Sequence, residues 1–143
     1  MARYVTRIES SLTPAAAFDY MADFSNARIW DPSVSAATRT SDGPVALGST
    51  FHLVSRFAGR DVPLDYTIVA YEPAQRVVLE ARKPGFVSRD TITFEPAATG
   101  SVVHYDALLE LAGVRRLFDP LLQRSFNGIG GRATRGMQAA LNP

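Results

Sequence analysis

The sequence contains no cysteine and only two histidines. The missing thiols exclude disulfides, thiolate nucleophiles and Cys-based metal sites, and two histidines alone are too few for a typical zinc site. We therefore expect no metal and no cofactor. A chain without cysteine fits a reducing compartment, and residues 1–30 hold no apolar run of signal-peptide length, so we expect a cytoplasmic protein.

An excess of either charge is also lacking. The 15 basic and 14 acidic residues leave a net charge of +1, and no block of like charges is longer than a pair such as Arg115 and Arg116. This pattern argues against a nucleic-acid partner. No run approaches 18 consecutive apolar residues, so we expect no membrane insertion. The remaining partner class is a small molecule, bound by a monomer or a homodimer.

What the chain does have is enough apolar material for one core. Its 143 residues are 46% hydrophobic, which suits a single domain with a sizeable interior. No internal repeat, low-complexity tract or linker interrupts the sequence. We expect one ligand-binding domain over residues 1–143.

Segments typical of β-strands dominate the first three quarters of the chain, separated by turn residues such as Pro84-Gly85. Between the first and second strands, Thr13 and Pro14 indicate the start of one short helix and Asp23 the start of another, which ends before Pro32. The expected strands are Tyr4–Glu9, Val34–Thr40, Gly48–Phe57, Val62–Tyr71, Arg76–Lys83, Phe86–Glu95 and Val102–Leu111.

One long amphipathic helix is expected from Leu117 to Leu141. At 1.5 Å per residue it spans roughly 37 Å, the length of a ten- or eleven-residue strand, so it can cover a whole sheet. Its apolar stripe has few large side chains, and four glycines lie in the helix interior. We interpret these glycines as positions of close helix-to-sheet packing or as a flexible point of the helix. A light lid indicates a pocket beneath it. The stripe consists of Phe118, Leu122, Ser125, Ile129, Ala133, Gly136 and Ala140.

This order of elements predicts an α+β fold, a seven-stranded antiparallel sheet gripping a long C-terminal helix, with two short helices after strand 1. Several motifs resemble the SRPBCC superfamily, also called START-like or helix-grip, and within it the polyketide cyclase/dehydrase-like branch. They begin at Phe18 (Phe-Asp-Tyr-Met-Ala-Asp-Phe), Trp30 (Trp-Asp-Pro), Leu47 (Leu-Gly-Ser), Tyr71 (Tyr-Glu-Pro), Thr93 (Thr-Phe-Glu-Pro) and Gly100 (Gly-Ser-Val-Val).

The resemblance covers essentially the full length. It implies a hydrophobic cavity between the sheet and the C-terminal helix, and it includes polyketide aromatases and cyclases, lipid or quinone carriers and pollen-allergen-like binders. It implies no shared catalytic motif. Ser101 departs from the pattern, since members of this branch more often carry threonine there.

Alternation along each strand assigns one face to the interior. Asp106 marks the outer face of the last strand and leaves Tyr105 inside, while Phe94 anchors the preceding strand and puts Asp90 on the concave face. Ala70 is expected to face inward in its strand, and the opening is expected near residues 118–126. The side chains expected to contact a ligand are Trp30, Phe51, Leu53, Phe57, Tyr66, Ile68, Leu79, Asp90, Ile92, Phe94, Tyr105, Phe118, Leu122, Ser125, Phe126 and Ile129.

Asp90 is the candidate catalytic residue. A carboxylate on the concave face should have a raised pKa and can act as a general acid or base; the alternative is a position near the open end of its strand, in water or beside an arginine. Tyr66 and Tyr105 offer phenols that donate to a ligand oxygen, or they are simply core. Trp30 either packs in the core or contacts the pocket mouth.

Two functions therefore stand. One is the binding or transport of a hydrophobic small molecule, such as a polyketide, fatty acyl, quinone or sterol-like ligand. The other is an enzyme of the polyketide cyclase, aromatase or dehydrase type, in which Asp90 or a cavity tyrosine moves a proton.

Overall fold

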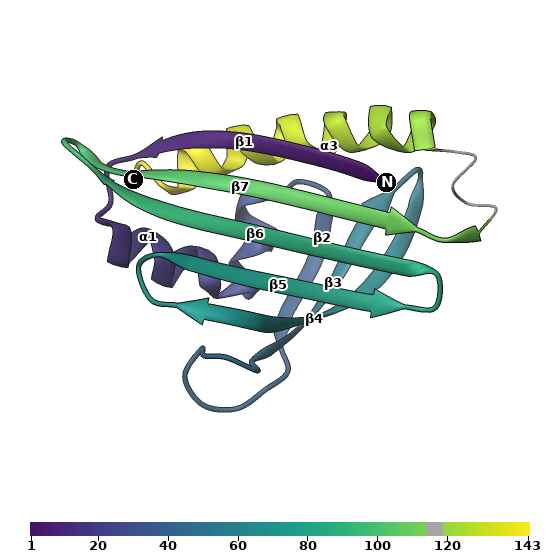
Figure 1. Ribbon diagram of the computed structural model, residues 1–143, viewed down its shortest axis with the longest axis horizontal. Coiled ribbons are helices and arrows are strands. Elements are labelled where there is room, and N and C mark those ends of the chain that lie inside the picture. Colours follow the sequence, from purple (N-terminus) through teal and green to yellow (C-terminus); the bar gives the residue numbers. More distant parts are fainter. Residues whose placement is uncertain (114–118) are drawn as a thin grey trace.

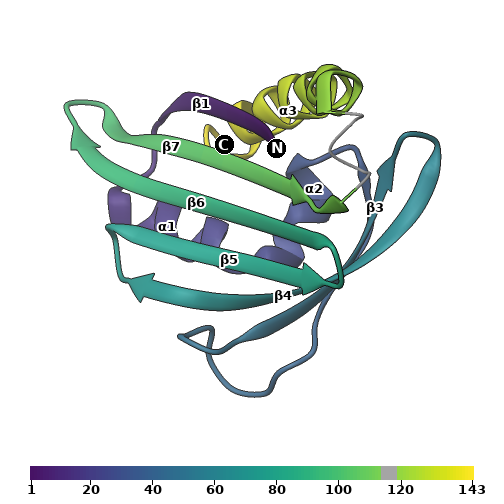
Figure 2. The same ribbon diagram turned by 45° about the vertical axis from the view of Figure 1, so that its right-hand side comes forward.

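Seven strands form one antiparallel sheet within residues 1–113 and 119–143, which the computed structural model describes. Their order across the sheet is β1-β7-β6-β5-β4-β3-β2, and the sheet curls around one concave face (Figures 1 and 2). The α+β helix-grip fold is thus confirmed. The strands are β1 (Ala2–Ser10), β2 (Val34–Arg39), β3 (Thr50–Phe57), β4 (Arg60–Glu72), β5 (Arg76–Lys83), β6 (Phe86–Ala97) and β7 (Gly100–Leu111).

Short helices follow β1 and begin at the predicted caps. Helix α1 (Pro14–Ala22) starts after Thr13, whose hydroxyl accepts a hydrogen bond from the Ala16 amide at 3.2 Å. Asp23 caps the next segment by accepting from the Ser25 amide. The second predicted helix is divided into a 3₁₀ turn, η1 (Phe24–Asn26), and a single α-turn, α2 (Ala27–Trp30).

A β-bulge in β4 corrects one predicted strand face. The pairing with β5 shifts between Ile68 and Ala70, so that Tyr71 stands opposite Val77. Because an extra residue reverses the alternation beyond it, Tyr71 faces the core in place of Ala70.

The end of the sheet under α1 is filled by aromatic rings. The Phe18 ring lies 5.1 Å from that of Tyr71 and 5.4 Å from that of Phe94, both edge-on. Phe24 packs in the same manner against Tyr66 at 5.0 Å. These rings close one half of the concave face with protein side chains.

Helix α3 (Asp119–Ala140) lies along β1 and is fixed at its C-terminal end (Figure 1). Met137 and Leu141 are buried there, and the Ser10 hydroxyl donates to the Leu141 carbonyl at 2.7 Å. Gly136 lies against the backbone of Trp30, since an added Cβ would stand 1.8 Å from the Trp30 carbonyl oxygen. At Gly136 the close packing is therefore between two helices, α3 and α2, and the predicted close approach of a glycine to the sheet is found at Gly130, over Tyr4 of β1.

The N-terminal half of α3 is held differently. The Gln123 side chain accepts from the amide of Arg3 and donates to its carbonyl, at 2.9 and 2.8 Å. These bonds occupy the open edge of β1. The first two residues of the predicted helix, 117 and 118, lie outside the described residues.

Candidate functional site

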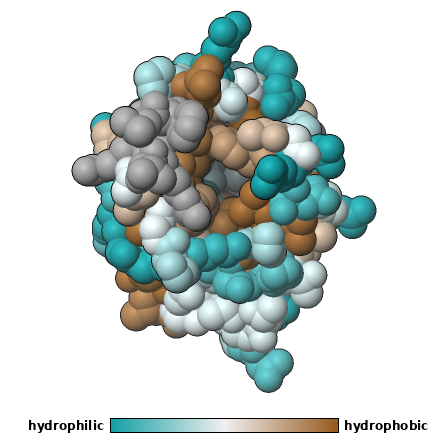
Figure 3. All heavy atoms as spheres, turned by 90° about the vertical axis from the view of Figure 1, so that its right-hand side faces the viewer, coloured by the Kyte–Doolittle hydropathy of each residue, from teal (hydrophilic) through white to brown (hydrophobic). Residues whose placement is uncertain are grey.

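A cavity of about 480 Å³ lies between the concave face of the sheet and α3. On the face of the molecule near the start of α3, the surface is hollowed, and hydrophobic residues border part of the hollow beside hydrophilic ones (Figure 3). The strands contribute Tyr4, Thr6, Ser55, Arg56, Phe57, Arg60, Val62, Leu64, Tyr66, Phe86, Ser88, Asp90, Tyr105, Ala107, Leu109 and Leu111, and Ala58 lies in the turn between β3 and β4. The helices and the loop after α2 contribute Trp30, Asp31, Ser33, Leu122, Phe126, Ile129, Gly130, Ala133 and Met137.

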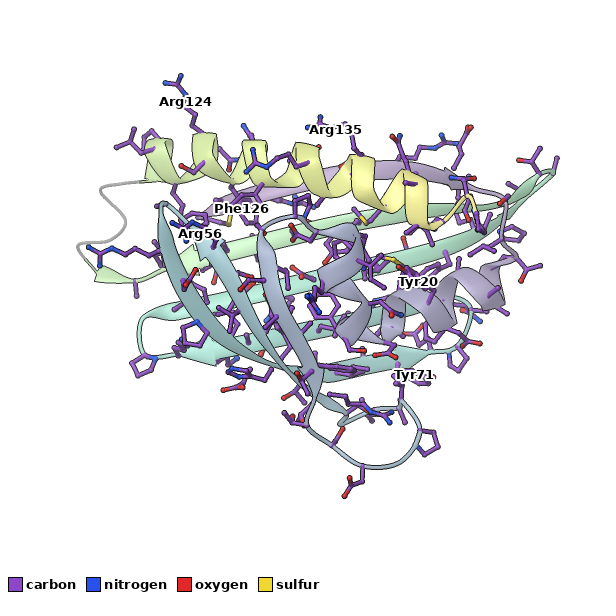
Figure 4. The ribbon with its side chains drawn as sticks, turned by 180° about the vertical axis from the view of Figure 1, so that it is seen from behind. Tyr20, Arg56, Tyr71, Arg124, Phe126 and Arg135 are labelled. Carbon is purple, nitrogen blue, oxygen red and sulfur yellow. The ribbon has the colours of Figure 1, made fainter. Side chains whose placement is uncertain are left out.

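Helix α3 forms the roof of the cavity with five apolar side chains among its lining residues. Phe126 points from α3 toward the sheet, whereas Arg124 and Arg135 point away from it (Figure 4). Leu122 and Ile129 flank Phe126 at helical spacing. Gly130 lies over the Tyr4 ring, where an added Cβ would stand 2.4 Å from ring carbons. The roof is therefore close to the sheet at Gly130 and lined by larger side chains toward the mouth.

Asp90 lies on the inner face of β6 and is 8% exposed. The Tyr105 hydroxyl on β7 donates to its Oδ2 at 2.8 Å, and within the described residues Oδ1 has no protein hydrogen-bond partner. Burial raises the pKa of Asp90 to about 7, the hydrogen bond from Tyr105 opposes this rise, and the charges of Asp31 and Asp106 add to it. Near neutral pH this carboxyl can both release and accept a proton.

Tyr105 itself remains a proton donor. Its pKa is raised well above the ordinary value, first by burial and then by the neighbouring charge of Asp90. Tyr66 on β4 forms a second polar pair with Ser88 on β6, with 2.8 Å between the two hydroxyl oxygens. Burial raises the pKa of Tyr66 as well. Both phenols are therefore neutral hydrogen-bonding groups on an apolar wall.

Asp31, the second residue of the Trp-Asp-Pro motif, also lines the cavity. Its Oδ1 accepts from the amide of Ser33 at 2.9 Å and from the Ser33 hydroxyl at 2.8 Å. Burial raises the pKa of Asp31, and the Ser33 hydrogen bonds and the charge of Arg132 oppose that rise. An Asp-x-Ser spacing directly after a short helix is typical of such a local motif.

Trp30 both packs in the core and touches the cavity. Its ring is 2% exposed and meets Tyr105 edge-on at 5.5 Å. Its Nε1 has no hydrogen-bond partner among the described residues. Core packing and contact with the cavity, given as alternatives for Trp30, thus both apply to this residue.

Half of the predicted contact residues line the cavity. These are Trp30, Phe57, Tyr66, Asp90, Tyr105, Leu122, Phe126 and Ile129. Six others belong to the packed core and do not line the cavity; in this core Phe18 meets Phe94 and Phe24 meets Phe51 edge-on. They are Phe51, Leu53, Ile68, Leu79, Ile92 and Phe94.

The remaining two predicted contacts belong to α3 or the segment before it. Ser125 is exposed and lines a groove beside the cavity, because helical spacing turns Leu122, Phe126 and Ile129 inward and leaves Ser125 on the outer flank. Phe118 lies outside the described residues.

Tyr4 and Thr6 were missed because the first strand was not assigned a face. Arg3, Val5 and Arg7 alternate with them along the strand and are exposed. The alternation that located Asp90 therefore also places Tyr4 and Thr6 on the inner face. The Tyr4 hydroxyl lies 3.2 Å from that of Thr134 on α3.

The described ranges hold no group of three or more histidine, aspartate or glutamate side chains arranged to bind a metal ion. Within the same ranges, no helix has both the length and the apolar character needed to cross a membrane.

Solved structures share this architecture at low sequence identity. A START superfamily protein from Mycobacterium smegmatis has a TM-score of 0.77 at 10% identity, over 99% of this chain and 97% of that one. Ginseng major latex-like protein 151 from Panax ginseng has a TM-score of 0.74 at 12% identity, over 99% and 98%. The di-domain ARO/CYC StfQ from the steffimycin biosynthetic pathway has a TM-score of 0.73 at 12% identity, over 98% of this chain and 50% of that one.

A comparison with curated proteins found no match. The family model described as polyketide cyclase / dehydrase and lipid transport matches residues 1–142. This match and the START-like neighbours confirm the resemblance read from the motifs. The chain belongs to the polyketide cyclase/dehydrase and lipid transport family.

Proposed function

We propose that the protein binds a hydrophobic small molecule of the polyketide, fatty acyl, quinone or sterol-like class, as a carrier or binding protein. The supporting observation is the cavity of about 480 Å³ between sheet and helix. Pockets for small molecules typically measure about 300–1,000 Å³ and combine apolar walls with a few placed polar groups. Here Asp90, Tyr105 and Tyr66 supply such groups on one side of an otherwise largely apolar wall.

Native mass spectrometry of the protein, purified from the cells that produce it, tests this proposal. The expected result is a mass adduct of one ligand per chain, released on denaturation and identified after extraction as an apolar molecule. Ala107 lines the cavity beside Asp90, its pairing partner on the neighbouring strand. Ala107→Phe fills the cavity and should abolish the adduct. The absence of an adduct, together with no saturable binding of the neutral probe N-phenyl-1-naphthylamine, would contradict the proposal.

The second candidate is an enzyme that cyclises or dehydrates a polyketide chain. The observation in its favour is the Asp90 carboxyl, buried, hydrogen-bonded by Tyr105 and with a pKa of about 7. A group of this kind can remove a proton next to a ketone and return it to a departing hydroxyl as water forms. Holding the folded chain in place contributes the rest of the acceleration.

Turnover of a synthetic poly-β-keto thioester, followed by mass spectrometry for loss of water, separates the two candidates. Proton transfer predicts that Asp90→Asn loses turnover by about 10²–10⁴-fold while the affinity for the thioester stays within a few fold. Unchanged turnover and affinity in Asp90→Asn would exclude Asp90 as the acid or base.

A further inference from the structure

A groove adjoins the cavity on the outer side, between the turn after β3 and helix α3. Ser33, Arg56, Ala58 and Ile129 line both hollows, so the two are neighbours with a shared wall. The groove is lined by Pro32, Ser33, Arg56, Ala58, Gly59, Arg124, Ser125, Gly128, Ile129 and Arg132. Three of these ten residues are arginine and none is acidic, in a protein whose net charge is only +1.

The arginines of the groove have spare hydrogen-bonding capacity. Arg56 reaches Asp61 at 3.5 Å and the Gly59 carbonyl at 3.4 Å, both long contacts on an exposed side chain. Arg132 and Arg124 have no hydrogen bond or salt bridge with another described residue. A guanidinium carries five donors that match a carboxylate or a phosphate, so these groups can still bind an anion.

The position of Arg132 connects the groove to the cavity. Its Nη1 folds back over Gly128, where an added Cβ would stand 3.5 Å away. Its charge acts on Asp31, which lines the cavity, although the two form no salt bridge. Arg56 approaches from β3 below Phe126 (Figure 4). Arg124 points away from the sheet and stands at the outer edge.

From this arrangement we propose that the groove binds the anionic group, carboxylate or phosphate, of an amphiphilic ligand whose apolar part occupies the cavity. Arg56 and Arg132 hold the anion, and Ser125 supplies a hydroxyl donor beside it. The inference rests on the proposed binding of a hydrophobic molecule and narrows the class of that molecule. The shared wall lets one ligand span both hollows.

Four amphiphiles with the same twelve-carbon chain test the anion site by calorimetry at pH 7.5 and low salt. Dodecanoate and dodecyl phosphate carry the two anionic groups, dodecanol carries none, and dodecyltrimethylammonium reverses the charge. We expect at least one anion to bind about fivefold or more tighter than dodecanol, and the cation to bind weakest. The preferred anion identifies the head group as carboxylate or phosphate. Added salt should reduce the advantage of the anion.

Three single variants assign the effect to the groove. Arg56→Gln and Arg132→Gln should each reduce anion affinity roughly two- to fivefold, as expected for exposed ion pairs. Arg132 lies outside the cavity lining, so Arg132→Gln should leave dodecanol binding unchanged, whereas Arg56→Gln should weaken the anion more than dodecanol. Arg135 lies on the same helix, is exposed and points away from the sheet, so Arg135→Gln is the matched control and should have no effect. All three positions are exposed, and unchanged thermal unfolding verifies that the variants fold.

The outcomes separate this inference from the proposed function. Dodecanol binding as tightly as both anions, or an equal loss in Arg135→Gln, would overturn the anion site and leave hydrophobic binding intact. If none of the amphiphiles and no neutral apolar probe binds, both proposals are overturned.

Discussion

Tyr105 donates its phenolic hydroxyl to Asp90 across 2.8 Å on the wall of the cavity. The two residues lie on neighbouring strands, two register positions apart, since Asp90 pairs with Ala107 and Ile92 with Tyr105. Both face inward, and both side chains are at least nine-tenths buried. The pair therefore places one titratable carboxyl and one neutral donor beside the largely apolar volume that a ligand would fill.

Replacing Tyr105 with phenylalanine should raise the pKa of Asp90 further. The hydrogen bond from Tyr105 favours the charged carboxylate and opposes the effect of burial, so its loss removes the stabilising partner. A pH titration of the Asp90 carboxyl carbon by NMR measures the change. Tyr4→Phe is the control, because the Tyr4 hydroxyl contacts Thr134 and not Asp90. A pKa that falls in Tyr105→Phe would contradict the assigned role of this bond.

Asp90→Asn should stabilise the protein in a pH-dependent manner. The folded pKa of Asp90 is raised from 3.8 to about 7, so the folded state holds more protons than the unfolded state between these values. The free energy of unfolding of the native protein therefore falls across this window as pH rises and levels off above it. Asparagine carries no charge, so the free energy of unfolding of Asp90→Asn does not fall in this way. The advantage of Asp90→Asn should grow from near zero at pH 4 to about 4 kcal/mol at pH 8.

Urea unfolding of both proteins at several pH values measures this difference. An advantage that is constant from pH 4 to pH 8 would mean that Asp90 does not titrate in the folded protein as burial requires.

Two glycines of α3 should respond oppositely to alanine. Gly131 has no atom within 4 Å of an added Cβ, so Gly131→Ala should raise the free energy of unfolding by up to about 1 kcal/mol through helix propensity. At Gly136 the added Cβ meets the Trp30 carbonyl oxygen at 1.8 Å, and backbone must move. Gly136→Ala should therefore lower the free energy of unfolding by about 1–3 kcal/mol. Chemical denaturation compares the two; equal effects of one sign would contradict the close approach of α3 to α2.

Trp30 offers an intrinsic signal for binding, because it is the only tryptophan and lines the cavity. Its emission should change saturably when dodecanol is added to the native protein, since a ligand replaces solvent or empty space beside the indole. The same titration of Ala107→Phe should leave the emission flat. A saturable change that persists undiminished in Ala107→Phe would place the ligand elsewhere.

Much of the site could be predicted from alternation alone. The outward charge at Asp106 identifies the inner face of β7. Alternation from Phe94 places Asp90 on the inner face of β6, where it is found. Local rules also located Thr13 and Asp23 as caps. These inferences depend on neighbours in sequence, and the chain satisfies them because the sheet buries only one face.

The boundary between packed core and open cavity could not be predicted in this way. Asp90 and Ile92 are consecutive inward residues of β6, yet the first lines the cavity and the second lies in the filled core. Ile92 belongs to the same buried cluster as the Phe18 and Phe24 rings, which come from helices far from β6 in the sequence. Likewise, the alternation of residues along β4 does not predict the bulge that turns Tyr71 inward.

The most direct test of a ligand cavity between sheet and helix is methyl NMR during titration with N-phenyl-1-naphthylamine. The side chains that line the cavity should show saturable shifts and contacts with the probe, namely Leu64, Leu109, Leu111, Leu122 and Ile129. The side chains of the filled core should stay unchanged, namely Leu53, Ile68, Leu79 and Ile92. No saturable shift, or shifts confined to the second set, would contradict binding in this cavity.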